Sequence, residues 1–595
     1  MKNLAYLNTY IYRYKWHFIT GTLFVAISVV FGIYPAQYIR LSFNEVEQVL
    51  LRYQSGSIID YAILSKTLLR YAAVIIGASI LKGAFTFFMR QTIIVASRRI
   101  EYDLKNEIYN HYQKLHLGFY RQNSTGDLMN RISEDVSRVR MYVGPAVMYG
   151  INVLVTLAIV IPIMLSISVK LTFYVLIPLP VLSYVIYHVS RLINARSEAV
   201  QRKLSELSTL AQETFSGIRV IKAFSKEHFF SEMFAGASTE YSEVNERLYK
   251  VNAMFMPLVM FLIGLSTLIT LYVGGMEALA GRLTTGNIAE FILYVNMLTW
   301  PVTSIGWVTS IVQRAEASQM RINEFLMTKP EIVNPTTQPF HFRGKVEFRS
   351  VTMVYLDSGV KALDNVSFTI EPGSTVGLVG KTGSGKSTVA SLILRQYDPT
   401  SGHILVDGKD LRTVNLDDYR KSLGVVPQDS YLFSDTIYNN IGFGLDDLDD
   451  EQWITASAEL ADLDSNIRDF PNAYQTKVGE RGITLSGGQK QRTALARAIA
   501  RRPVLYILDD CLSAVDTETE DRILRNIRKL TKGTTTLIIS HRISSIKDAD
   551  KIIVLDKGRK VEEGTHHQLV EAGGYYARMY HQQVQAASIP VDLDE

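Results

Sequence analysis

Long apolar runs fill the first half of the chain, whereas the second half alternates short apolar runs with polar segments. Six of the long runs could each cross the hydrocarbon core of a bilayer as a helix. Buried helices of a soluble protein do not explain runs of this length and number. We therefore predict an all-α transmembrane domain over residues 1–328. Its six helices are expected at about residues 18–39, 68–96, 141–169, 170–193, 251–276 and 288–313.

The segments between these runs differ in their content of lysine and arginine. The segments after the second and fourth runs are basic, and so is the N-terminus, with residues such as Arg98, Arg196 and Lys15. The segments on the other side are short or nearly balanced in charge. Because Lys and Arg accumulate in cytoplasmic loops, we predict a multi-pass protein of the cell inner (cytoplasmic) membrane. Both termini and the second half of the chain would lie in the cytoplasm.

One lysine interrupts the second apolar run. Lys82 stands inside Tyr71–Met89, which is otherwise uncharged. A charge in the middle of a membrane helix costs about 2.5–3.5 kcal/mol on insertion scales. Two interpretations stay open: the ammonium group faces a polar cavity or partner, or it only snorkels toward the membrane surface.

The second half of the chain begins after a stretch that is typical of a linker. Residues 329–340 contain several prolines and show no hydrophobic periodicity. From Val346 onward, strands that alternate with helices predict a largely parallel sheet. We predict an α/β domain over residues 341–582 and a tail over residues 583–595.

A glycine-rich loop in the α/β half matches the pattern G-x-x-x-x-G-K-S. It follows an apolar strand, Thr375–Val379, and precedes a predicted helix, Thr388–Leu394. In that context, backbone N–H groups surround a phosphate at the helix N-terminus, as in a P-loop nucleotide-binding domain. Lys386 would reach the β- and γ-phosphates of ATP, and the Ser387 hydroxyl would bind Mg²⁺. The predicted phosphate-binding residues are Gly380, Lys381, Thr382, Gly383, Ser384, Gly385, Lys386, Ser387 and Thr388.

Two further patterns belong to the same chemistry. The apolar strand Val504–Asp509 ends in a carboxylate at the place where P-loop enzymes organise Mg²⁺, and Asp510 could address an attacking water. A strong helix former, Lys490–Ala500, follows a serine and two glycines that predict a second anion-binding helix start. One chain hardly needs two such sites, so we predict that each completes a site on another copy. The second start comprises Ser486, Gly487, Gly488 and Gln489.

The two basic cytoplasmic segments read as helices that continue beyond the membrane. Arg98–Leu117 leads to a short turn at Gly118–Arg131, and Asn194–Gln212 leads to one at Glu213–Phe224. Solvated helical hairpins would also explain this pattern. We favour elements that dock on the nucleotide-binding domain, because the energy of ATP needs a mechanical path to the membrane.

Over essentially its whole length, the sequence resembles the ATP-binding cassette (ABC) exporters. The segment Leu485–Gln489 (LSGGQ) matches the signature of that family and accompanies the glycine-rich loop. The resemblance implies that Tyr355 stacks on adenine, that Gln428 contacts Mg²⁺ and the docking helices, and that His541 contacts the γ-phosphate. It therefore implies a catalytic set of Asp510, His541 and Gln428, and a Mg²⁺ site at Ser387, Gln428 and Asp509.

The resemblance also extends to the order of the domains. A membrane domain followed by one cassette resembles a half-transporter, which must dimerise. Thr476–Gly482 resembles the cross-talk loop of exporters, and Ser513–Asp516 resembles a loop that contacts the second cassette. Gly118–Arg131 and Glu213–Phe224 match the coupling regions of the membrane domain.

The sequence departs from the exporter pattern directly after the Mg²⁺ aspartate, where the family has glutamate and this chain has Asp510. A carboxylate one methylene shorter would lie about 1 Å or more from the place at which it could activate the attacking water. A misplacement of this size can cost on the order of 100-fold in rate. The segment ILDDCLSAVD resembles the subunit of heterodimeric multidrug exporters whose own ATP site is slow. We favour a heterodimer. The alternative is a homodimer in which Asp510 is a sufficient base.

These features predict ATP-driven efflux of amphipathic or hydrophobic compounds, drug-like or lipid-like, by alternating access. The alternatives are a homodimeric lipid flippase or exporter and an ATP-gated regulatory membrane protein with little hydrolysis of its own. An importer fits less well, because importers usually keep the cassette and the membrane domain on separate chains. Large side chains that suit an adaptable cavity, but suit packing equally well, are Tyr34, Phe85, Phe88, Tyr149, Met164, Phe255, Met256, Trp300 and Trp307.

Composition narrows the partners. A net charge of +4 on 595 residues is too small to argue for nucleic acid. The single cysteine, Cys511, excludes an internal disulfide and a cysteine-based zinc site. The expected partners are a second half-transporter, membrane lipid and a hydrophobic small-molecule or lipid substrate, with ATP and Mg²⁺ as cofactors.

Overall fold

The computed structural model describes residues 3–56, 61–445, 450–479, 485–511, 517–530 and 532–588. The chain divides into two compact units. The helical unit comprises Met1–Gln113 and Thr125–Thr328, and the α/β unit comprises Lys114–Ser124 and Lys329–Glu595.

Six helices in the described part of the helical unit are long and apolar enough to cross a membrane. This result confirms the predicted all-α membrane domain. Several of the helices contain proline, which membrane helices tolerate better than soluble ones. The elements are η1 (Asn3–Leu7), α1 (Asn8–Arg13), α2 (Lys15–Gln54), α3 (Tyr61–Lys114), α5 (Thr125–Asn130), η2 (Arg131–Asp135), α6 (Val136–Met141), η3 (Tyr142–Ala146), α7 (Val147–Ile167), α8 (Val169–Leu176), α9 (Pro178–Ser216), α10 (Ile218–Ala223), α11 (Glu227–Leu279) and α12 (Thr285–Met327).

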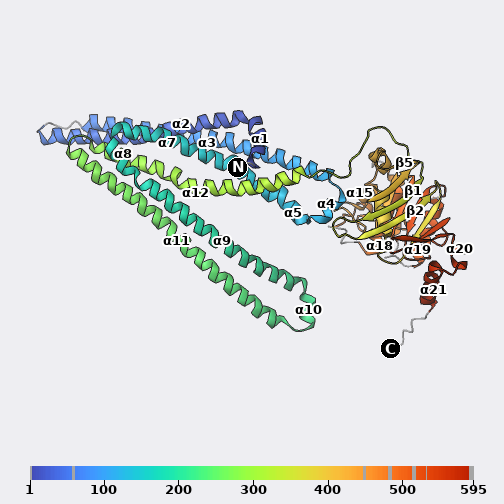
Figure 1. Ribbon diagram of the computed structural model, residues 1–595. Coiled ribbons are helices and arrows are strands. Elements are labelled where there is room, and N and C mark those ends of the chain that lie inside the picture. The colour runs from blue at the N-terminus through green and yellow to red at the C-terminus, as the bar shows by residue number, and fades with distance from the viewer. Residues whose placement is uncertain are drawn as a thin grey trace. The chain divides into compact units, whose positions relative to one another are not determined.

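The helices extend well beyond the apolar runs. α3 continues to Lys114 and α9 continues to Ser216, so the polar segments predicted to be helical are helical. α9 and α11 lie side by side, and the short helix α10 joins them at one end (Figure 1). Apolar side chains at this end are exposed, with 73% of Phe215, 61% of Val220 and 71% of Phe224 accessible. The described residues of the helical unit therefore leave most of each of these three side chains uncovered.

The core of the helical unit lies around α12. Phe291, Tyr294 and Leu298 are fully buried on one face of this helix, together with apolar residues of α2, α7, α8, α9 and α11. An ion pair joins α2 to α12 in the same region, with 3.3 Å between Arg40 Nη1 and Glu290 Oε2.

The α/β unit contains two sheets. The larger sheet has the strand order β10-β9-β3-β8-β7-β6, and only its edge strand β10 runs antiparallel to its neighbour. This confirms the largely parallel sheet. The smaller sheet has the order β2-β1-β4-β5 and is antiparallel. The strands are β1 (Val346–Val354), β2 (Lys361–Ile370), β3 (Thr375–Val379), β4 (Ser401–Val406), β5 (Lys409–Asp410), β6 (Leu423–Val426), β7 (Leu505–Asp509), β8 (Thr535–Ile539), β9 (Lys551–Asp556) and β10 (Arg559–Gly564).

The prediction that strands alternate with helices from Val346 onward is wrong for the first strands. β1 and β2 follow each other without an intervening helix and pair antiparallel. The connection 355–360 is too short for the crossover that parallel neighbours need, which takes a dozen or more residues. Helices separate β3 from β4, β5 from β6, β6 from β7 and β7 from β8, whereas β4 and β5, and β8, β9 and β10, again follow one another directly.

Helices cover the larger sheet and fix the loops at its edge. α13 (Lys386–Ile393) buries Val389, Leu392 and Ile393 completely against the sheet. Complete burial of such side chains contributes about 1.5–3 kcal/mol each. The loop between β3 and α13 is therefore held between two buried elements. The other helices of this unit are α4 (Leu117–Gln122), α14 (Leu416–Lys421), α15 (Ile437–Gly442), α16 (Glu451–Leu460), α17 (Asp464–Arg468), η4 (Ala473–Gln475), α18 (Gly487–Ala500), α19 (Thr517–Leu530), α20 (His566–Glu571) and α21 (Tyr575–Ser588).

Candidate functional site

The glycine-rich loop connects β3 to α13, as the sequence predicted. Two of its glycines are required by space, and one of them also by its backbone conformation. A Cβ on Gly380 would lie 2.2 Å from the carbonyl oxygen of Leu555. Gly385 has a φ of +99°, and a Cβ there would lie 2.4 Å from the carbonyl oxygen of Ala362. Backbone N–H groups can therefore approach an anion here without side chains in the way.

Lys386 points back along this loop. Its Nζ donates hydrogen bonds to the carbonyl oxygens of Gly380, at 2.8 Å, and Lys381, at 3.0 Å. Burial lowers the pKa of the Lys386 ammonium, and the charges of Asp510 and Asp509 oppose that shift. A partly desolvated ammonium bound only to neutral carbonyls would gain from a phosphate, because hydrogen bonds between charged groups are stronger.

Asp509 ends the buried strand β7 beside the start of α13. Burial raises the pKa of its carboxyl, whereas a hydrogen bond with Ser387 and the charge of Lys386 lower it. The hydroxyl of Ser387, the amide of Gln428 and the carboxylate of Asp509 supply oxygen ligands of the kind that Mg²⁺ prefers. A divalent cation here would relieve the cost of keeping a buried carboxylate ionised, so these residues fit the expected metal.

Asp510 and His541 form a pair at the same edge of the sheet. The distance from His541 Nδ1 to Asp510 Oδ1 is 2.8 Å. Asp510 follows β7 and has a φ of 49°, and its backbone N–H donates to the carbonyl of Ile539 at the end of β8. The carboxyl ends of the parallel strands β3, β7 and β8 thus meet here, which is where open α/β sheets bind ligands.

These groups line one cavity of about 450 Å³. It brings together the predicted aromatic residue Tyr355, most of the glycine-rich loop, Gln428, Asp509, Asp510 and His541. Within the loop, Gly380, Lys381 and Ser384 do not line the cavity. The cavity is also lined by Val360, Lys361 and Ala362. No sequence pattern identified these residues, because only the fold brings the end of the β1–β2 connection next to the loop.

The second predicted anion site forms as a helix start but does not line this cavity. Ser486 caps α18, and its Oγ accepts from the backbone N–H of Gln489 at 3.2 Å. The Gln489 side chain accepts in turn from the N–H of Ser486 at 2.9 Å. Ser486 and Gly487 are exposed, and none of the residues 485–489 lines the cavity around Lys386. The N-terminus of α18 is therefore not part of the chain's own phosphate cradle.

Two predicted loops lie wholly or partly outside the described residues. Of the predicted cross-talk loop Thr476–Gly482, only residues up to 479 are described. The predicted dimer-contacting loop Ser513–Asp516 lies entirely outside them.

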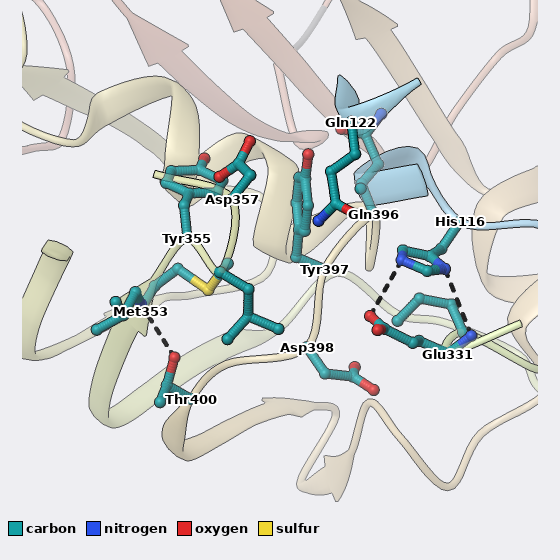
Figure 2. Close-up of a pocket in the computed structure, with 14 residues that line it drawn as sticks. His116, Gln122, Glu331, Met353, Tyr355, Asp357, Gln396, Tyr397, Asp398 and Thr400 are labelled. Carbon is teal, nitrogen blue, oxygen red and sulfur yellow. Dashed lines mark hydrogen bonds and ion pairs between the residues drawn. The ribbon is translucent and has the colours of Figure 1, made fainter. Parts of the chain in front are cut away.

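The first docking turn belongs to two different units. Residues 118–124 lie in the α/β unit, which confirms docking for that part, whereas residues 125–131 belong to the helical unit. Figure 2 shows the His116 ring beside Glu331: Nε2 lies 3.1 Å from the carboxylate, and Nδ1 lies 3.5 Å from the backbone N–H. These residues line a second cavity, of about 240 Å³. The other turn, Glu213–Phe224, lies in the helical unit, and its docking stays a prediction.

Tyr355 links the docking segment to the phosphate cradle, because its side chain lines both cavities. Its hydroxyl lies 3.1 Å from Thr388 Oγ1 on α13. The Arg121 guanidinium of α4 lies 4.8 Å from the centre of the Tyr355 ring, and its Nη2 lies 3.5 Å from Asp357 Oδ2. Tyr397 packs edge-on against Tyr355, at 5.3 Å between ring centres (Figure 2). Sequence reasoning missed this arginine contact, although the basic residue in a docking turn was visible.

Comparisons with known proteins match both halves of the chain to the same family. The description "ABC transporter transmembrane region" matches residues 17–302, and "ABC transporter" matches residues 363–513. The chain is 35% identical to the Multidrug resistance-like ATP-binding protein MdlA of Escherichia coli (strain K12), over 87% of this chain and 88% of the relative. It is 34% identical to the ATP-dependent lipid A-core flippase of Syntrophus aciditrophicus (strain SB), over 84% and 83%. A solved bacterial Atm1-family ABC exporter with ATP bound has a TM-score of 0.77 at 25% identity, covering 98% of this chain and 99% of that chain.

Proposed function

Because the chain belongs to the ABC transporter family and carries both regions of an exporter, we propose that it is a half-transporter. As a dimer, it uses ATP to export amphipathic or hydrophobic compounds, drug-like or lipid-like, across the cytoplasmic membrane. The names of its multidrug and lipid-flippase relatives support this range of cargo. The many exposed apolar side chains of the six long helices support contact with lipid.

One observation supports the proposal that the chain forms a dimer. The cavity around Lys386 lacks the N-terminus of α18, although that helix start is preformed and capped. In the proposal, Ser486 and the two glycines after it bind the γ-phosphate of the ATP that a second chain holds. The second chain's signature segment closes this chain's cavity in the same way. ATP contacts that exist only in the closed pair shift the population from an inward-facing to an outward-facing state.

The predicted site residues of the cavity then have the following roles. Tyr355 stacks on adenine, and the loop N–H groups and Lys386 bind the phosphates. Thr388 is the last residue of the phosphate-binding set. His541 contacts the γ-phosphate, and Asp510 orients the attacking water. Mg²⁺ bound by Ser387, Gln428 and Asp509 would neutralise phosphate charge. Gln428 and α4 transmit the state of the site toward the helices.

We propose further that this site is slow and that the partner is a different half-transporter. Asp510 stands where the family has glutamate, and its carboxylate is bound to His541 at 2.8 Å. A longer side chain would reach further into the cavity. The chain keeps an intact signature segment, so it can complete a partner's competent site while hydrolysing little itself. The alternative, a homodimeric lipid flippase or exporter, is favoured by the similarity to lipid A-core flippases.

The orientation of the chain follows from charge. The basic N-terminus and the basic segments on α3 and α9 favour the cytoplasm for both termini and for the α/β unit. The membrane would be the inner membrane of the cell.

Vesicle transport tests this function. The purified chain, alone and with a co-expressed half-transporter, is reconstituted into liposomes with outward-facing nucleotide domains. We expect ATP-dependent accumulation of a lipophilic fluorescent dye, or flipping of a labelled phospholipid, that the Lys386→Ala variant does not support. Normal ATP binding without any transport in either preparation would favour the regulatory alternative and contradict the proposal.

A further inference from the structure

The lysine inside the second membrane helix lies in a cavity of the helical unit. Lys82 stands on α3, 11 residues after Tyr71 and 7 residues before Met89 in the otherwise uncharged run. A charge at this depth is costly, so residues of this kind commonly mark substrate or ion pathways and have a partner. Among the described residues, no carboxylate lies within ion-pair distance of the Lys82 ammonium.

The ammonium group reaches across to α2 because Gly32 leaves room for it. A Cβ on Gly32 would lie 3.2 Å from Lys82 Nζ and 3.3 Å from the terminal methyl of Met297 on α12. Both groups line a cavity of about 590 Å³ between α2, α3, α7 and α12. This volume falls within the range of small-molecule sites. The lysine therefore turns toward the cavity and does not only extend along its own helix.

The polar lining of this cavity can donate hydrogen bonds but carries no negative charge. Ser28 and Thr86 share a hydrogen bond of 2.9 Å beside Lys82, and both hydroxyls approach its backbone carbonyl. No aspartate or glutamate is among the lining residues. The hydroxyls of Ser28, Ser79 and Thr86 already donate to backbone carbonyls, so the lining side chains left to donate to a ligand are Asn152, Thr156 and Asn296.

The remaining lining is apolar. Met297 and Trp300 on α12 and Ile39 on α2 contribute large side chains, and 64% of Trp300 is exposed. A flexible thioether and an indole suit a variable hydrocarbon tail. The cavity thus combines one cation, neutral donors and an apolar wall.

We infer that this cavity binds the headgroup of an anionic amphiphile, with a phosphate or carboxylate on Lys82 and a tail along Met297 and Trp300. The inference rests on the proposed export function and names the class of cargo. The bound anion supplies the counter-charge that Lys82 lacks among the described residues. A cationic amphiphile of the same length would place two like charges together and is disfavoured.

Binding is measured by quenching of Trp300 with amphiphiles that share an ω-brominated dodecyl tail. The full chain carries Trp16→Phe and Trp307→Phe, and its remaining tryptophan, Trp453, lies in the α/β unit. Dodecyl phosphate, dodecanoate and dodecyltrimethylammonium probes are titrated in phosphatidylcholine nanodiscs. We expect half-maximal quenching by the two anions at a concentration at least about tenfold lower than by the cation. The two anionic probes distinguish a phosphate from a carboxylate site.

Variants of one lysine and one glycine decide the assignment. Lys82→Met should abolish the preference for anions, and Lys82→Arg should retain it. Gly32→Ala keeps the charge but crowds the ammonium group, so the preference should fall. Lys66→Met, on the same helix before the apolar run, is the matched control and should behave as the parent.

Two outcomes separate this inference from the export function. Equal binding of all three probes in the parent, or an anion preference that survives Lys82→Met, would overturn the inference even if transport is observed. An anion preference that depends on Lys82 in a chain that binds ATP but transports nothing would uphold the binding site and contradict the export function. Dissociation of the dimer in Lys82→Met would instead assign the lysine to a contact between subunits and overturn the inference.

Discussion

At the scale of single residues, the proposed function assigns the rate of hydrolysis to the pair Asp510 and His541. The Asp510 carboxylate and the His541 imidazole lie 2.8 Å apart, and both side chains line the cavity that contains Lys386. The backbone of Asp510 is left-handed, a conformation in which aspartate is several-fold enriched over most side chains. A short acidic residue is thus compatible with this turn, and in the proposed slow site its shortness limits its reach toward a water on the γ-phosphate.

Lengthening this side chain should speed hydrolysis. We expect Asp510→Glu to raise the ATPase rate by one to two orders of magnitude, because a misplacement of about 1 Å can cost on the order of 100-fold. Steady-state phosphate release from the purified dimer measures the effect. Asp510→Asn, which keeps the size but removes the charge, is the control. An unchanged rate in Asp510→Glu, with a thermal unfolding midpoint equal to that of the parent, would show that distance is not the defect.

Arg121 offers a second test at this scale. Its guanidinium lies over the Tyr355 ring, an arrangement worth about 0.5–1 kcal/mol at exposed sites. We expect Arg121→Ala to loosen Tyr355 and weaken ATP binding about two- to fivefold, and Arg121→Lys to have an intermediate effect. Titration with a fluorescent ATP analogue measures the change. The exposed Arg138, paired with Glu134 one turn away, provides the control variant Arg138→Ala; equal affinities in the two alanine variants would contradict the link.

At the scale of elements, the sequence predicted the features that are determined by residues close together along the chain. β3, the glycine-rich loop and the start of α18 were predictable, because an apolar run, glycines and a serine cap act within a few residues. The antiparallel β1–β2 pair was not, because strand order is decided by partners distant in sequence. For the same reason Lys361 was missed beside Lys386. The direction of Lys82 stayed open from sequence, since only the packing of α2 against α3 shows the space above Gly32.

The end of the α9–α11 pair at the short helix α10 allows a test of docking. This end exposes Phe215, Val220 and Phe224, and we expect these side chains to dock on a nucleotide-binding domain. Val220→Asp should leave ATP binding unchanged but reduce ATP-dependent transport at least tenfold, because a charge would be buried at the contact. The half-exposed Phe234 on α11 lies outside this end. Loss of transport in Phe234→Asp as large as in Val220→Asp would argue for a general effect on the helix pair.

At the scale of the whole molecule, we propose that the chain is one half of a dimeric exporter. It contains the membrane helices of an exporter and one complete phosphate cradle, and it presents a capped signature helix that its own cradle does not use. The motifs predicted the family and the apolar runs predicted six spans, because both depend on patterns within one chain. It could not establish the partner, since the surface that a partner covers is not marked by any periodicity. The departure at Asp510 is the sequence feature on which our proposal of two different halves rests.

The most direct test of this half-site is the ATPase activity of the purified chain, alone and paired with a half-transporter that has glutamate at the position of Asp510. We predict slow turnover for the chain alone and little further loss in Asp510→Asn. The pair should hydrolyse ATP rapidly. Ser486→Arg in this chain should abolish that activity, because the signature segment could no longer complete the ATP site of the partner. Full turnover by the chain alone, lost in Asp510→Asn, would contradict the slow site and the heterodimer together.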